Sequence, residues 1–272
     1  MVLLSLLAGA VIGIALGMTG GGGATLGVPL LVYGLGLGTR EAVAISLAAV
    51  GITSLIGFLH RWRTGQVEIP TGLLFAVAGM LGAPIGSSVA TNIPEWLLMS
   101  LFGGLMMLVA VLLWRQASRH VQPASGLPDP DSLDAPTCRR KEDGSLILNS
   151  PCAALLSMVG LLTGFLSGMF GVGGGFVIVP ALIFFSGMSV HRAIGTSLMV
   201  IALVSSSGMA SKVIEGRSIP LAITALFVIG GVAGLFVGQR IAARLSPKKL
   251  QKTFAIAILG IAAFVITKNL LA

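Results

Sequence analysis

The stretch that decides the fold reads GMFGVGGGFVIVP, from Gly168 to Pro180, and it places five glycines within eight residues of an apolar run. Water-soluble proteins use glycine-rich loops to bring the backbone close to a phosphate. Here no lysine follows the glycines, and polar residues are almost absent around them. The reason for these glycines therefore depends on the class of protein in which they lie.

The composition of the chain is that of a membrane protein. Its 272 residues are 55% hydrophobic and only 10% charged, whereas soluble domains are about 25% charged. Apolar runs of about 15 to 20 residues recur from end to end, which is typical of membrane-spanning helices. The net charge of +8 comes from Lys and Arg in short loops, where they set orientation and meet anionic lipid. We predict an all-α polytopic membrane protein that binds no nucleic acid.

The chain consists of two similar halves. Glycines and a proline of the first half recur 151 positions later in the second half, and a further glycine pair recurs 152 positions later. A nearly constant displacement over about 80 residues indicates an internal duplication. We expect repeats at residues 1–114 and 151–272, joined by a polar, flexible linker at residues 115–150. The matching pairs include Gly9/Gly160, Gly13/Gly164, Gly17/Gly168, Gly20/Gly171, Pro29/Pro180, Ser46/Ser197, Gly82/Gly234 and Gly86/Gly238.

Each repeat divides into five apolar segments. The predicted segments are 2–16, 24–35, 41–59, 70–90 and 95–114 in the first repeat, and 151–167, 175–187, 191–210, 218–241 and 248–266 in the second. The second segment of each repeat would reach only about 18 Å as a helix, well short of the roughly 30 Å hydrocarbon core. Together with the segment before it, it forms a broken or re-entrant helix pair with a glycine-rich joint inside the membrane.

The distribution of positive charge favours two inverted repeats. An odd number of segments in each repeat inverts the second repeat, and 13 of the 17 Lys and Arg then fall on one face. If the first two segments are merged into one span, the split becomes 10 to 7. The positive-inside rule prefers the first arrangement. We expect a multi-pass protein of the plasma (inner) membrane, with both termini outside and the linker in the cytoplasm. The opening segment lacks a positive n-region and has a counterpart mid-chain, so we expect it to be retained.

The joints are candidate anion sites. Inverted repeats with interrupted helices are typical of secondary transporters, and irregular backbone at membrane depth is tolerated where it is buried or lines a cavity. A helix start exposes unpaired amides with a partial positive charge, and glycine lets that backbone approach a ligand. Hydroxyls nearby can donate further hydrogen bonds. The predicted substrate-binding residues are Gly20, Gly22, Gly23, Ala24, Thr25, Ser46, Gly171, Gly173, Gly174, Gly175, Phe176, Thr196 and Ser197.

Other interpretations of the same residues remain open. The stripes at Gly9, Gly13 and Gly17 and at their counterparts favour close helix packing over ligand contact, and hydroxyls in spans often bond back to their own helix. A nucleotide site would need a Gly-Lys-Ser/Thr ending or a βαβ unit. The sequence shows no metal cluster, cofactor motif or catalytic dyad, and we treat Cys138 and Cys152 as incidental. We therefore expect neither a cofactor nor an enzyme.

At these residues the chain resembles the sulfite exporter TauE/SafE family, also called the toluene-sulfonate uptake permease family. The resemblance rests on GMFGVGGGFVIVP and its weaker partner GMTGGGGATLGVP at residues 17–29, and extends through HRAIGTSL at 191–198 and GGVAGLFVG at 230–238. It implies a permease for sulfur-containing anions such as sulfite or sulfonates. The first repeat departs from the pattern, with Ala24 and Thr25 where the second has Gly175 and Phe176, so the two halves of the site need not be equivalent.

The function that we expect is secondary transport of a small sulfur-containing anion, in the export direction, by alternating access at a midplane site between the repeats. A passive anion channel, or a permease for another small organic anion, would use the same helix starts. The expected partners are the anionic substrate and the lipid bilayer, and a homodimer is compatible with the sequence.

Overall fold

The computed structural model describes residues 2–21, 23–118, 150–170, 175–214 and 220–244, together with residues 256, 259 and 260. This part of the chain is helical, with no strand. The elements are α1 (Val2–Thr19), α2 (Ala24–Pro29), the π-helix η1 (Leu30–Gly34), α3 (Thr39–Arg63), α4 (Ile69–Thr91), α5 (Glu95–Ser118), α6 (Ser150–Phe170), α7 (Gly175–Ser186), α8 (Val190–Ile214) and α9 (Leu221–Arg244).

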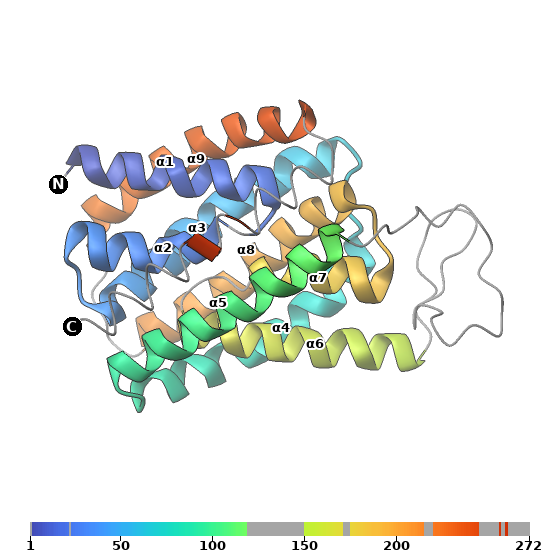
Figure 1. Ribbon diagram of the computed structural model, residues 1–272, viewed down its shortest axis with the longest axis horizontal. Helices are drawn as coiled ribbons and strands as arrows, with labels where there is room; N and C mark the ends of the chain where they lie inside the picture. Colours follow the sequence, from blue (N-terminus) through green and yellow to red (C-terminus); the bar gives the residue numbers. More distant parts are fainter. Residues whose placement is uncertain are drawn as a thin grey trace.

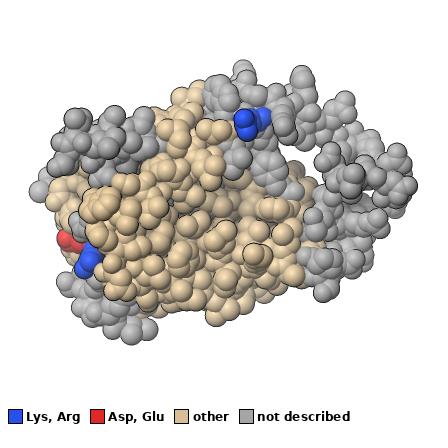
Figure 2. Space-filling model, turned by 60° about the horizontal axis from the view of Figure 1, so that its bottom comes forward, with Lys and Arg blue, Asp and Glu red and all other residues tan. Residues whose placement is uncertain are grey.

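Five of these helices, α3, α4, α6, α8 and α9, are long and apolar enough to cross a membrane. Helix α4 shows why they suit lipid: it exposes large apolar side chains at every fourth position, at Leu73, Val77, Leu81 and Ile85. Figure 2 shows a broad surface without Lys, Arg, Asp or Glu across the middle of the face in view. A soluble monomer rarely exposes so large an apolar patch. The class predicted from composition, an all-α multi-pass membrane protein, is confirmed.

The helices pair across the two halves of the chain. Helix α1 lies along α9 at one edge of the bundle, α4 lies along α6 at the other, and α3 and α8 lie between these pairs (Figure 1). In the apolar stretches of α3 and α8, 72% of the residues are buried, against 39% in α4 and α9. Helices α3 and α8 therefore form the centre of the bundle.

Glycines without side chains allow the outer pairs to pack closely. In α1, Gly9, Gly13 and Gly17 lie directly against the backbone of α9 at Phe227, Gly231 and Leu235. In α6, the glycines 151 positions later lie against α4 in the same way, at partners displaced by 152 positions; these glycines are Gly160, Gly164 and Gly168, and their partners are Phe75, Gly79 and Ala83. The packing interpretation of both glycine stripes is confirmed.

The two central helices run in opposite directions. Leu47, near the start of α3, lies beside Gly208, near the end of α8. Further along, Gly51 lies beside Ser205, and Gly57 beside Leu198. Helices α3 and α8 occupy corresponding places in the two halves of the sequence.

Several helix boundaries differ from those expected. Helix α3 was expected at 41–59 but spans Thr39–Arg63, because a helix continues past its apolar run into charged residues. The short second segment of the first half is split into α2 and η1 directly after Pro29, whereas α7 continues as an α-helix past Pro180 at the corresponding position. Most of the expected segment 248–266, and most of the linker, lie outside the described residues.

Cys152 corrects another expectation. It is fully buried near the start of α6 and is disulfide-bonded, so it is not incidental. The other cysteine of the chain, Cys138, lies outside the described residues. Two cysteines 14 positions apart match no recognised framework, which is why the sequence did not reveal the bond.

Candidate functional site at the two glycine joints

The first joint begins with a sharp turn at Gly20, directly after α1. Gly20 has φ = +74°, a conformation that side chains other than glycine rarely adopt. It also lies against α8, where an added Cβ would stand 2.7 Å from the Cα of Ile194. The hydroxyl of Ser197 donates a hydrogen bond of 2.6 Å to the carbonyl oxygen of Gly20. Conformation and contact both require glycine here, and α8 holds the joint in place.

The first joint meets the start of α7 inside the bundle. Gly21 lies directly against Gly175, the first residue of α7, and an added Cβ on Gly175 would stand 2.5 Å from the Cα of Gly21. After the joint, Gly23 lies against the backbone of α1 at Ile12 and Leu16, so that the chain folds back along the helix it has just left. The starts of α2 and α7 are therefore neighbours.

The amides available at the first joint differ from those expected. The amide of Ala24 donates to the carbonyl of Gly21 (3.2 Å), and that of Leu26 donates to the carbonyl of Gly23 (3.1 Å). The expectation that the first turn of α2 leaves its amides unpaired is therefore wrong for these two groups. The amides of Gly21 and Gly23 have no backbone partner among the described residues. The donors that remain for a ligand lie in the joint itself, one turn earlier.

Ser46 provides an unpaired hydroxyl near the first joint. It lies on α3 and is fully buried, and its oxygen has no hydrogen-bond partner within the described part of the chain. It stands directly against Gly27, three residues into α2, where a side chain would collide with the hydroxyl. Thr25 is also fully buried on α2. Thr25 is thus part of the short helix that follows the first joint, and Ser46 packs against that helix from α3.

The two predicted hydroxyls on α8 have different environments. Ser197 contacts the first joint, but its oxygen also lies 2.9 Å from the carbonyl of Ile194, so its hydrogen bonds serve the backbone. Thr196 is fully buried and accepts a hydrogen bond of 3.0 Å from the amide of Glu68, in the loop between α3 and α4. Thr196 therefore contacts this loop.

The structure thus brings together Gly20, Gly21, Gly23, Gly175 and Ser197, with Ala24 fully buried beside them. Gly21 was missing from the predicted residues, although it follows Gly20 directly. Four predicted glycines, Gly22, Gly171, Gly173 and Gly174, lie outside the described residues, as does the side chain of Phe176.

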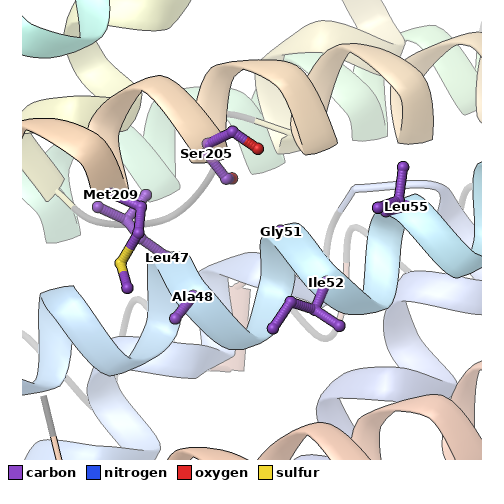
Figure 3. A pocket seen from close by; sticks show the side chains of 8 residues that line it. Leu47, Ala48, Gly51, Ile52, Leu55, Ser205 and Met209 are labelled. Carbon is purple, nitrogen blue, oxygen red and sulfur yellow. The ribbon is translucent and has the colours of Figure 1, made fainter.

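Three buried polar groups of the two central helices were not singled out from the sequence as site residues. Ser54 on α3 and Ser205 on α8 are 151 positions apart, fully buried and unpaired among the described residues. Ser205 borders a small cleft of about 140 Å³ between α3 and α8, whose other walls are mainly apolar (Figure 3). The third group, Arg61 near the end of α3, is buried although the sequence placed it in a charged loop. Burial of this kind leaves no signal in the sequence.

The fold and the joints define the class of the protein. Apolar helices long enough to cross a membrane surround two central helices, and two short helices, α2 and α7, begin side by side among them. No group of three or more His, Cys, Asp or Glu that could hold a metal occurs in the described ranges. An integral membrane protein with interrupted helices fits the architecture of transporters.

Comparison with known proteins identifies the family. The model of the sulfite exporter TauE/SafE family matches residues 5–265, so the chain belongs to this family of membrane transporters. A probable membrane transporter protein of Xylella fastidiosa (strain Temecula1) is 35% identical over 270 residues, which cover 96% of this chain and 93% of that protein. The probable membrane transporter protein YdhB of Bacillus subtilis (strain 168) is 26% identical over 242 residues, which cover 89% and 90% of the two chains.

Proposed function

We propose that this transporter carries a small sulfur-containing anion, such as sulfite or an organosulfonate, out of the cell by alternating access at the paired glycine joints. The observation that carries the proposal is the contact between Gly21 and Gly175, because it places the starts of α2 and α7 side by side. Two helix starts that converge on one point concentrate amide donors and positive dipole ends there. The family description supports the choice of sulfite as substrate.

The chemistry of the joint suits an oxyanion. Glycine amides at Gly21 and Gly23 are without backbone partners in the described chain, and Ser46 of α3 offers an unpaired hydroxyl against the half-helix α2. Neutral donors of this kind bind an anion through charge-assisted hydrogen bonds without a fixed positive charge. An anion held by neutral groups can leave again, as transport requires.

The proposed alternating access rests on two inverted repeats. Two observations support the inversion. The equivalent helices α3 and α8 run antiparallel, and the glycine stripes of α1 and α6 take partners at matching displacements in α9 and α4. In transporters built this way, one repeat rocks against the other around a fixed midplane site. The close glycine contacts join α1 to α9 and α4 to α6, and each of these pairs takes one helix from each repeat, so the bodies that move would be bundles made of both repeats.

Flux measurement tests the proposal. Purified protein in proteoliposomes loaded with unlabelled sulfite should take up labelled sulfite from outside by exchange. The variant Gly173→Leu should abolish this exchange. Cooperative unfolding of the variant would show that it is still folded. Absence of flux above protein-free vesicles, for sulfite and for sulfonates, would remove the proposed substrate class. Flux that equilibrates the anion but never exchanges it against a gradient would instead indicate a passive channel.

A further inference from the structure

Arg61 is a buried cation for which the described structure provides no counter-ion. Only 6% of its surface is exposed, although it lies two residues before the end of α3 and next to the exposed Trp62 and Arg63. Within the described ranges no carboxylate forms an ion pair with it. The carboxylate of Glu68, in the following loop, accepts a hydrogen bond from Thr71. A buried charge without a partner is strongly unfavourable.

The guanidinium of Arg61 also has unused hydrogen-bond donors. Of its five N–H groups, one on Nη1 donates to the side-chain oxygen of Gln66 at 2.8 Å. Its Nε is buried and has no partner among the described residues. An arginine in this state presents a forked pair of donors, the geometry that binds two oxygens of one oxyanion.

A second buried donor lies at the same level of the bundle. Thr53 of α3 contacts Gly231 of α9, and one turn later Gly57 contacts Leu235, so these helices run parallel with a fixed register. Continued by one more turn, this register brings Arg61 to the level of Gln239. The side-chain nitrogen of Gln239 is likewise buried and has no partner in the described part of the chain.

This polar pair lies close to the first joint. The backbone nitrogen of Gln239 lies near Gly17, one turn before the turn at Gly20. On the other side, α3 and α8 run antiparallel with Gly57 beside Leu198, which brings the end of α3 toward the part of α8 that holds Gly20. An anion leaving the joint toward this end of the bundle would meet Arg61 and Gln239.

We infer that Arg61 and Gln239 form a second binding site for the transported oxyanion, between the first joint and the end of the bundle at which α3 finishes. The inference rests on the proposed function and adds to it a second, positively charged binding site. The guanidinium attracts the anion toward the joint, and the neutral joint then holds it. Sequence alone assigned Arg61 to membrane orientation.

Binding of sulfite to purified protein in lipid-free detergent tests the inference by isothermal titration. The variant Arg61→Met removes the guanidinium and keeps an unbranched apolar stem, and Arg63→Met is the matched control because Arg63 is exposed two residues away. We expect the Kd for sulfite to rise at least about tenfold in Arg61→Met, because hydrogen bonds to charged groups are lost. It should stay within about twofold of wild type in Arg63→Met, since exposed charges contribute little. Equal Kd values in the two variants would overturn the inference.

A second variant distinguishes anion binding by this pair from misfolding and from a purely structural role of Arg61. In Gln239→Glu the new carboxylate supplies Arg61 with an internal counter-ion, so this variant should unfold at a higher temperature than wild type and lose its stabilisation by sulfite. Stabilisation by sulfite equal to that of wild type would contradict the site. If wild type itself binds neither sulfite nor sulfonates, the proposed function fails instead. If Arg61→Met instead releases a co-purified anionic phospholipid detected by mass spectrometry, and sulfite binding is unchanged, the oxyanion is a lipid phosphate and the inference is wrong.

Discussion

At the scale of single residues, the glycines of the joint serve two different purposes. Gly20 is required by its positive φ and by its contact with α8. Gly21 does not have a positive φ, and its importance comes from the neighbouring backbone of Gly175. Any side chain at Gly21 would separate the starts of α2 and α7. The proposed site therefore requires that residue 21 has no Cβ.

Alanine at Gly21 should destabilise the protein and stop transport. The added Cβ would clash with the backbone of Gly175, which cannot move away without displacing α7, so we expect a loss of about 1–3 kcal/mol in unfolding free energy. Thermal unfolding in detergent and sulfite exchange in proteoliposomes measure the two effects.

The matched control is alanine at Gly104 of α5, where an added Cβ meets no atom within 4 Å. Alanine is favoured over glycine in a helix by about 0.5–1 kcal/mol, so this variant should be unchanged or slightly more stable. If Gly21→Ala and Gly104→Ala behave alike, the joints are not in contact.

At the scale of helices, the sequence predicted which segments are helical better than where each helix begins and ends. The displacement of 151 positions identified corresponding segments, and the short lengths of α2 and α7 followed from their apolar runs. The π-helix at Leu30–Gly34 and the extension of α3 to Arg63 could not be predicted, because they depend on how Pro29 and the helix end are packed. For the same reason the sequence could name Ser197 as a site residue but could not say that its hydroxyl bonds to Gly20.

The glycine stripes provide a test of equivalence between the halves. Alanine at Gly13 would press on Gly231 of α9, and alanine at Gly164 would press on Gly79 of α4, in both instances backbone against backbone. Each substitution should lower the unfolding free energy by about 1–3 kcal/mol, and by similar amounts, because the two contacts correspond. Thermal unfolding of both variants, beside Gly104→Ala, measures this. A large loss in one variant and none in the other would show that the two helix pairs are not equivalent.

At the scale of the whole molecule, two observations bear on the orientation of the chain in the membrane, and they disagree. The distribution of Lys and Arg favours a cytoplasmic linker. The disulfide at Cys152, where the linker meets α6, argues against this placement because disulfides are rare in a reducing cytoplasm. We give more weight to the charge distribution, since it involves many residues.

Cysteine labelling decides the orientation. In a variant with both native cysteines replaced by alanine, Thr64→Cys lies in the loop after α3 and Asn92→Cys in the loop after α4. A membrane-impermeant maleimide should label Asn92→Cys in intact cells, and Thr64→Cys only after the membrane is opened. The reverse pattern would place the linker outside and make the disulfide an extracytoplasmic one.

Together, the three scales lead to one claim, that a negative solute is held where the glycine joints of the two halves meet. A crystal structure of the protein soaked with selenite, an anomalous scatterer that resembles sulfite, tests this claim most directly. The claim predicts an anomalous peak within hydrogen-bonding distance of the joint backbone at Gly21 and Gly23, lost when sulfite is added in excess. A peak that lies only at Arg61, or anywhere else remote from the joints, in protein that transports sulfite would contradict it.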